Sequence, residues 1–181
     1  MSTTIREAYA SGRAGGEPFS ELIWAQPRAL HSEYELRAGD QVLGTLRFRS
    51  VFRSFATGQS ADGCWTFKRQ GFLSTHVTVR VCEAEGDVAV FRNRTWRGGG
   101  TLELPDGRKY RANVNFWASR YGFKTEDGVP LLTFRSGGLI HMSLPVEVHE
   151  AARGLVELPW LIMLGGYLCV MLRRDSAAAA S

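Results

Sequence analysis

The chain has 181 residues, of which 44% are hydrophobic and 22% charged, and its formal net charge is +4. This length suits one domain with its own core, and the composition excludes wholesale disorder. The positive charge is concentrated in residues 41–80 and 91–124, while the rest of the chain is mildly acidic. The sequence therefore predicts a basic face on an otherwise acidic body.

The two ends of the chain predict tails around one folded domain. Residues 1–18 contain no apolar run of the kind found in signal peptides, so we expect a flexible N-terminal tail. Residues 19–174 are expected to fold, and residues 175–181 to form a second flexible tail.

The cysteines predict neither a disulfide framework nor a zinc site. Cys64, Cys82 and Cys169 are odd in number, dispersed, and without a C-x-x-C spacing. This pattern favours a reducing compartment. We therefore expect a cytoplasmic protein that is at most peripheral at the inner membrane face.

Residues 21–149 alternate between apolar and polar side chains with period 2, and turn residues recur every 8–12 positions. The clearest example is IHMSLPVEVH (140–149), in which apolar side chains occupy every second position. This pattern is typical of antiparallel strands in a sandwich or barrel. No window of this region shows a sustained helical period, so the fold class is mainly β.

Residues 100–136 predict a meander of three hairpins. Gly107 is expected in a left-handed bulge position, and Asp127-Gly128 suits a two-residue turn. A turn is expected at Ala118-Ser119, and because this pair is not a favoured two-residue turn, we expect a longer loop with the same register there. These turns keep apolar partners on one face. The predicted pairs are Leu102–Tyr110, Glu103–Lys109, Val114–Phe123, Phe116–Tyr121, Arg111–Glu126, Trp117–Arg120, Phe123–Leu132 and Tyr121–Phe134.

The apolar stretch LPWLIMLGGYLCVML (158–172) predicts a helix over about residues 156–174. As a helix this stretch is roughly 22 Å long, which is short for a hydrocarbon core of roughly 30 Å. Because it has no polar face, it must be buried on every side. A closed barrel of about twelve strands around the helix achieves this burial, and Gly165-Gly166 leave room for large wall side chains. The alternative is a C-terminal membrane anchor flanked by Arg173-Arg174.

Several segments together resemble the tubby C-terminal-like superfamily, which includes tubby proteins, phospholipid scramblases and plant LURP-one-related proteins. The segments that carry the resemblance are WTFKRQGF (65–72), HVTVRV (76–81), FRNRTWRGGGTLELPDGRKYRANVNFW (91–117), YGFKTEDGVPLLTF (121–134) and the terminal apolar helix. The chain looks like a small, single-domain bacterial member. The resemblance implies a closed barrel around a hydrophobic C-terminal helix, and, from tubby proteins, binding of phosphoinositide headgroups.

The function expected from these observations is a non-enzymatic module that binds an anionic ligand, such as a phospholipid headgroup at a membrane surface. Arginine suits phosphate because its guanidinium is planar and bidentate, and a Gly-rich loop exposes N–H groups to an anion. The candidate ligand-binding residues are Lys68, Arg69, Arg92, Arg94 and Arg97. Alternatively, each of these side chains only lies on the solvent-exposed exterior of the barrel and binds no ligand.

Other functions are less well supported by the sequence. A scramblase-like or membrane-anchored protein would need the terminal helix in the bilayer, and the acidic calcium segment and cysteine cluster of scramblases are missing. A structural or interaction protein without a small ligand is a further alternative. The chain has no G-x-S-x-G, H-E-x-x-H, P-loop or G-x-G-x-x-G motif, so no enzyme, cofactor or metal site is expected. Nucleic acid is not an expected partner, and a monomer is expected.

Overall fold

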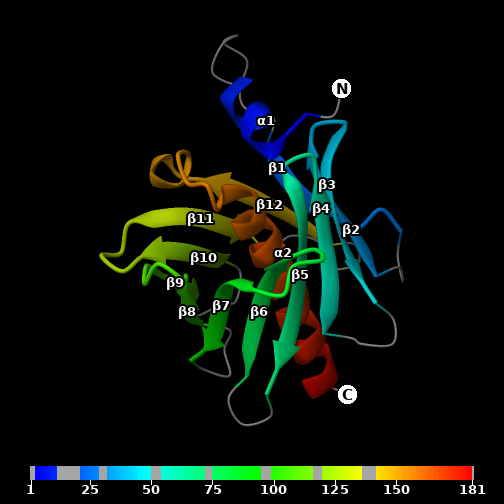
Figure 1. The fold of residues 1–181 in the computed structure, drawn as a ribbon. Coiled ribbons are helices and arrows are strands. Elements are labelled where there is room, and N and C mark those ends of the chain that lie inside the picture. The colour runs from blue at the N-terminus through cyan, green and yellow to red at the C-terminus, as the bar shows by residue number, and fades with distance from the viewer. Residues whose placement is uncertain are drawn as a thin grey trace.

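The computed structural model describes residues 3–11, 21–28, 32–49, 54–71, 75–94, 99–115, 120–135 and 142–180. Within these residues the chain forms twelve β-strands, two α-helices and one short 3₁₀ helix (Figure 1). The helices are α1 (Ile5–Ser11), η1 (Glu150–Ala152) and α2 (Leu158–Ala179). The strands are β1 (Leu22–Ala25), β2 (Glu33–Ala38), β3 (Gln41–Phe48), β4 (Phe55–Ser60), β5 (Gly63–Gln70), β6 (His76–Val81), β7 (Asp87–Asn93), β8 (Gly100–Glu103), β9 (Lys109–Val114), β10 (Arg120–Thr125), β11 (Pro130–Arg135) and β12 (Ser143–Val148).

The strands form one closed antiparallel barrel. Each strand pairs with its neighbours in sequence, and β1 closes the barrel by pairing with both β2 and β12. Closure gives every strand two partners, so the barrel has no unpaired edge. The predicted fold class, a closed barrel of about twelve strands around a C-terminal helix, is confirmed.

Helix α2 runs through the barrel, as Figure 1 shows, and its residues from Leu158 to Met171 are buried on every side. The helix begins two residues later than predicted and continues to Ala179, where a flexible tail was expected. Pro159 lies in the first turn, where its missing N–H costs no hydrogen bond. Among the described residues, no helix combines the length and the apolar character that a membrane span requires.

The glycine pair in α2 lets the helix approach the wall closely. A Cβ on Gly165 would lie 2.0 Å from the ring of Phe134, and one on Gly166 would lie 2.7 Å from the ring of Trp24. In the wall, a Cβ on Gly44 would lie 2.4 Å from the terminal methyl of Met163. Small residues thus face large ones in both directions, as expected for the glycine pair from the sequence.

The predicted strand pairs of the meander are confirmed in two of its three hairpins. The predicted two-residue turn at Asp127-Gly128 is wrong: the register shifts after Phe123, and the Thr125 N–H donates to the Val129 carbonyl, so the turn contains residues 126–128. Leu102 pairs with Tyr110 and Phe123 with Leu132, and Gly107 has the predicted positive φ of 87°. The hairpin between β9 and β10 is shifted by two residues, which makes its predicted register wrong. The observed pairs in it are Val114–Tyr121, Ala112–Phe123 and Arg111–Lys124.

The shifted register continues to the end of the described strands. The Asn115 N–H donates to the carbonyl of Arg120, so these two residues are paired and the register differs from that of the expected loop. Because the shift is an even number of residues, every side chain keeps its predicted face. The predicted pairs Phe116–Tyr121 and Trp117–Arg120 involve Phe116 and Trp117, which lie outside the described residues.

The expected N-terminal tail is ordered in part. Ile5–Ser11 form α1, and the side chain of Ile5 is completely buried in the core. Thr4 and Glu7 form a reciprocal capping box: the Glu7 N–H donates to Thr4 Oγ1 at 3.0 Å, and the Thr4 N–H donates to Glu7 Oε2 at 2.9 Å. Arg6 donates to the carbonyl of Val156, just before α2. The tail expectation therefore has to be corrected for α1.

The prediction that the chain has no disulfide was also wrong. Cys64 and Cys82 form a disulfide between the entry of β5 and the residue after β6, with Cα atoms 5.4 Å apart. The Cys82 N–H donates to the Cys64 carbonyl, so the two residues are direct neighbours in the sheet. A pairing of this kind depends on strand register, which spacing in the sequence does not reveal.

Candidate anion-binding surface

The barrel has two ends that differ in charge. We call the end at which α2 begins, beside α1, the entry end, and the end at which the C-terminal part of α2 emerges the exit end (Figure 1). Each end comprises the last three residues of every strand there, the described connections beyond them, and the adjoining part of α2, with α1 added at the entry end.

The exit end is basic. Its described cationic residues are Arg28, Arg47, Arg49, Lys68, Arg69, Arg92, Arg94, Arg120, Arg135, Arg173 and Arg174. Its described acidic residues are Glu33, Glu35 and Asp175. An end of this composition presents a positive potential to an approaching anion.

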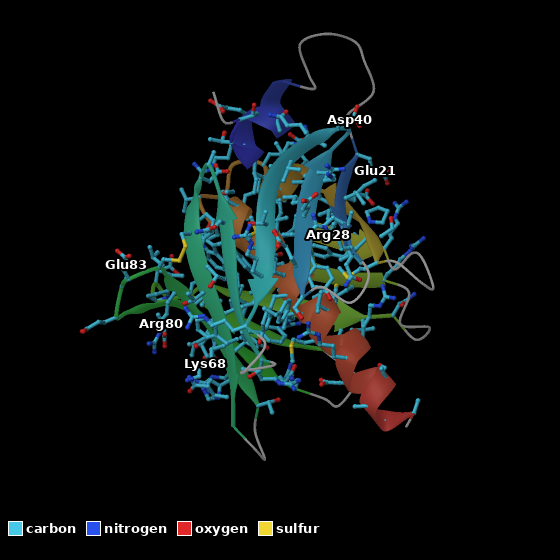
Figure 2. All side chains as sticks on the ribbon, turned by 90° about the vertical axis from the view of Figure 1, so that its right-hand side faces the viewer. Glu21, Arg28, Asp40, Lys68, Arg80 and Glu83 are labelled. Atoms are coloured by element: carbon cyan, nitrogen blue, oxygen red, sulfur yellow. A yellow bond between two sulfur atoms is a disulfide. The ribbon has the colours of Figure 1, made fainter. Side chains whose placement is uncertain are left out.

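The entry end is acidic. Its described acidic residues are Glu7, Glu21, Asp40, Asp62, Glu83, Glu85, Asp87, Glu103, Asp106, Glu126, Asp127, Glu147, Glu150 and Glu157. Its described cationic residues are Arg6, Arg37, Arg80, Arg108, Lys109, Arg111, Lys124 and Arg153. Figure 2 shows Asp40 toward the end that carries α1 and Lys68 toward the opposite end. The segments predicted to be basic contribute to both ends. Their described cations at the exit end are Arg47, Arg49, Lys68, Arg69, Arg92, Arg94 and Arg120, and those at the entry end are Arg80, Arg108, Lys109, Arg111 and Lys124. The exit end is basic also because it contains Arg28, Arg135, Arg173 and Arg174 from outside these segments.

Lys68 and Arg92 lie on the outer face of three adjacent strands. In β5 and β7 the neighbouring Phe67 and Phe91 are completely buried inside the barrel, so Lys68 and Arg92 point outward. His76 on β6 pairs directly with Arg92 and lies diagonally from Lys68. The strand register thus brings two of the predicted site residues onto one surface.

The ion pairs distinguish the predicted residues from one another. Arg92 donates to Glu103 at 2.7 Å, so its charge is shared with a carboxylate on β8. Lys68 and Arg94 are exposed and form no ion pair within the part of the chain that the structure describes. Arg97 lies outside the described residues. Lys68 and Arg94 are therefore the predicted residues with charge available to a ligand.

Arg69 differs from the others because it occupies an inward-facing position at the rim of the barrel. It follows the buried Trp65 and Phe67 with period 2, and its guanidinium reaches the end of α2. There it holds both carboxylate oxygens of Asp175, at 2.6 and 3.2 Å. The structure therefore separates Arg69 from the outer-face residues with which it was predicted.

Two residues that the site prediction missed extend the outer face across β3 and β4. The guanidinium of Arg49 stacks over the ring of Phe55, 5.1 Å from its centroid. Phe55 in turn pairs with Lys68 in the sheet. Arg49, Phe55 and Lys68 form a row with an aromatic ring between two cations. The period-2 pattern LRFR marks Arg49 as outward, but the partner strand could not be identified without the register.

The rim of the exit end is built by aromatic packing around α2. Tyr167 stacks on Phe48 and Phe67 and donates its hydroxyl hydrogen to the carbonyl of Ser54 at 2.6 Å. Arg174 stacks over the Phe48 ring at 4.1 Å. Burial raises the pKa of the Tyr167 hydroxyl above its ordinary range, so it remains protonated and keeps this hydrogen bond. These contacts fix the position at which the helix leaves the barrel.

At the entry end, an ion pair joins the β8–β9 hairpin to the residue before α2. The buried carboxylate of Glu157 accepts a hydrogen bond from Arg108 in the β8–β9 hairpin. Arg108 also donates to Asp106 and to the Tyr110 hydroxyl, and these carboxylate contacts raise the pKa of the Arg108 guanidinium. Burial raises the pKa of Tyr110, and the Glu157 charge adds to this effect. The charges of Arg108 and Glu157 are therefore paired with each other, and the pair holds the hairpin against the start of α2.

One cluster on the outer face of β11 and β12 contains residue types that occur in catalytic triads. Thr133 Oγ1 lies 2.8 Å from His149 Nε2, and His149 Nδ1 lies 3.8 Å from Glu147 Oε1. The second distance exceeds a hydrogen bond, and Glu147 accepts a hydrogen bond from Arg135 at 2.7 Å. The carboxylate therefore does not orient the imidazole as a triad carboxylate does.

The described part of the chain offers little to a metal ion or to an anion outside the two ends. No group of three or more histidine, cysteine, aspartate or glutamate side chains there is placed to hold a metal ion. A shallow depression of about 540 Å³ lies on β3–β5 toward the entry end. Its lining has no charged side chain: Val42, Leu43, Gly44, Thr45, Gln59, Ser60, Ala61, Gly63 and Cys64. The depression therefore offers no ionic contact to an anion.

Comparison of the chain with protein-family models, with curated proteins and with solved structures gives no match in any of the three.

Proposed function

We propose that this protein is a non-enzymatic binding module that holds an anionic ligand, such as a phospholipid headgroup at a membrane surface, on the exit end of its barrel. The observation that carries the proposal is the separation of charge between a basic exit end and an acidic entry end. The exit end has eleven described cationic side chains against three acidic ones, whereas the entry end has eight against fourteen. The separation favours a body that approaches a negative surface in one orientation.

The chemistry of the exit end suits phosphate groups. Exposed arginine and lysine side chains contribute about 1 kcal/mol each near an anionic bilayer surface. Lys68 and Arg94 have charge available for such contacts, and Phe55 places an aromatic ring between Arg49 and Lys68. Aromatic rings beside cations suit the boundary between headgroups and acyl chains.

The position of α2 supports a binding module over the scramblase-like alternative. The helix residues Leu158 to Met171 are buried within the barrel, and their wall partners interlock with Gly165 and Gly166. Insertion of α2 into a bilayer would first have to open this core. A surface-binding role needs no such opening.

Flotation with lipid vesicles tests the proposal. Phosphatidylcholine vesicles with and without phosphatidylglycerol would be mixed with the wild-type protein and with the double variant Lys68→Ala/Arg94→Ala. We expect the wild-type protein to float only with the anionic vesicles. The double variant should bind roughly 30-fold more weakly, because two contacts of about 1 kcal/mol each are lost.

A matched control removes one lysine and one arginine from the entry end, as Arg80→Ala/Lys109→Ala. This variant has the same net charge as the exit-end variant, so it should retain wild-type flotation. Equal loss in both variants would show that only net charge matters, and no flotation of the wild-type protein would reject the lipid ligand.

A further inference from the structure

The opening of the barrel at the exit end, where Arg69 meets Asp175 of α2, is called the mouth. A carboxylate of the chain itself already occupies the arginine there. Asp175 of α2 places both carboxylate oxygens on the Arg69 guanidinium, at 2.6 and 3.2 Å. This two-point geometry is the one in which arginine binds both carboxylates and phosphates. The side chains of Arg69 and Asp175 are 29% and 52% exposed, so the pair is accessible to solvent and to a competing anion.

The other acidic residues of this end have partners on the outer face. Glu33 bonds Arg47 at 3.0 Å, and Glu35 lies 3.2 Å from Arg37. Of the three described acidic residues of the exit end, Asp175 is therefore the one that lies at the mouth. Arg174, the residue before it, is held over Phe48 and also donates to Ser32.

The segment that carries Asp175 has left the core. Burial along α2 ends at Met171, Leu172 is partly exposed, and residues 175–180 are exposed. Movement of this last part of the helix would leave the buried part unchanged. The carboxylate can thus leave Arg69 at low cost to the barrel.

We propose that Asp175 is a built-in competitor for the anion site: its carboxylate occupies Arg69, and a phosphate group replaces it when ligand binds. This inference rests on the proposed function, and it adds Arg69 to the site as a residue that is masked in the free protein. An intramolecular competitor lowers the apparent affinity by the fraction of time that it occupies the site. Ligand binding would also release the last part of α2 from the barrel rim.

The substitution Asp175→Asn tests this, because it keeps the size of the side chain and removes its charge. We expect this variant to bind inorganic phosphate and phosphatidylglycerol vesicles about fivefold or more tightly than the wild-type protein, the equivalent of about 1 kcal/mol. The matched control, Glu33→Gln, removes the same charge from the same end but from Arg47. It should gain clearly less affinity. A gain in Glu33→Gln equal to that in Asp175→Asn would overturn the proposal, since it would reduce the effect to net charge.

Two further measurements separate this inference from the proposed function. Adding Arg69→Ala to Asp175→Asn should abolish the gain, whereas persistence of the gain would contradict a role for Arg69. Titration of the wild-type protein with phosphate should shift the backbone resonances of residues 175–179 toward unfolded values. If Lys68→Ala/Arg94→Ala weakens vesicle binding and Asp175→Asn does not strengthen it, the competitor role of Asp175 is rejected and the proposed function stands. If Asp175→Asn binds phosphate more tightly while the double variant binds vesicles as the wild-type protein does, the outer-face site of Lys68 and Arg94 is rejected and the competitor role of Asp175 stands. No binding by any variant would reject both.

Discussion

At the scale of single residues, the contact between α2 and the wall is set by glycine. Gly165 faces the ring of Phe134, which is itself completely buried. A methyl group at this position would need space that the ring already fills. The absence of a side chain at Gly165 is therefore a packing requirement.

We predict that Gly165→Ala destabilises the protein by about 1–2 kcal/mol. Overpacking costs roughly 1–3 kcal/mol, and the better helix propensity of alanine returns at most about 1 kcal/mol. Gly154→Ala is a suitable control because no atom lies within 4 Å of the Cβ position there. Urea unfolding of both variants would measure the difference, and equal midpoints would contradict the close packing of α2 against Phe134.

Three buried acidic groups predict a loss of stability at high pH. Burial raises the pKa values of the Tyr121 and Tyr167 hydroxyls and of the Cys169 thiol above their ordinary ranges. The unfolded chain therefore loses these protons at a lower pH than the folded chain does. Their contribution is fully present below about pH 8.5 and declines above it, by up to about 1.4 kcal/mol per pH unit for each group that has titrated in the unfolded state alone.

The measurement is the urea midpoint between pH 7 and pH 10.5. We expect the midpoint to fall over this range, and to fall less steeply in Cys169→Ala, which lacks the thiol. An unchanged slope in that variant would mean that Cys169 is not buried in the folded protein.

At the scale of elements, the Cys64–Cys82 disulfide adds a covalent link to strands that are already paired. The register of β5 and β6 and the backbone hydrogen bond between the two cysteines hold this position without the bond. The bond closes a segment with a sequence separation of 18, and Figure 2 shows it close to Glu83 in the β6–β7 connection.

Reduction is therefore expected to lower stability without opening the barrel. Closure of a segment of this length predicts a loss of about 3 kcal/mol in the free energy of unfolding. Urea unfolding in the presence and absence of a dithiol reductant measures this difference in the free energy of unfolding. Cys64→Ser/Cys82→Ser should resemble the reduced protein and should not respond to reductant. A reductant effect in that variant would place the sensitivity elsewhere.

The elements differ in how well the sequence predicts them. Strands were predictable because their side chains alternate, and α2 because it has no polar face. Helix α1 was missed, although the capping box Thr4–Glu7 and the large aliphatic residue Ile5 were available as signals. A helix of seven residues has too little periodicity to stand out, and its stability depends on tertiary contacts that the sequence does not display.

At the scale of the whole molecule, the sequence indicated cationic segments but not where their side chains would gather. Each hairpin runs from one end of the barrel to the other, so the strands divide the cations of residues 41–80 and 91–124 between both ends. The basic exit end results from this division together with Arg28, Arg135, Arg173 and Arg174. The roles within the predicted site depended on register and rim position. Arg69 and Lys68 are adjacent in sequence, yet one points to the mouth and holds Asp175 while the other points outward. The fold implied by the resemblance agrees with the barrel, while membership in that superfamily stays a prediction.

The orientation of the barrel on an anionic bilayer tests the central claim most directly. A polarity-sensitive dye would be placed at the exit end in Pro27→Cys or at the entry end in Asp127→Cys, both of which are exposed positions. Labelling is selective because Cys64 and Cys82 are bonded and Cys169 is buried. We predict that phosphatidylglycerol vesicles shift the emission of the dye at position 27 and leave the dye at position 127 unchanged. A shift at position 127 alone, or equal shifts at both positions, would contradict binding through the exit end.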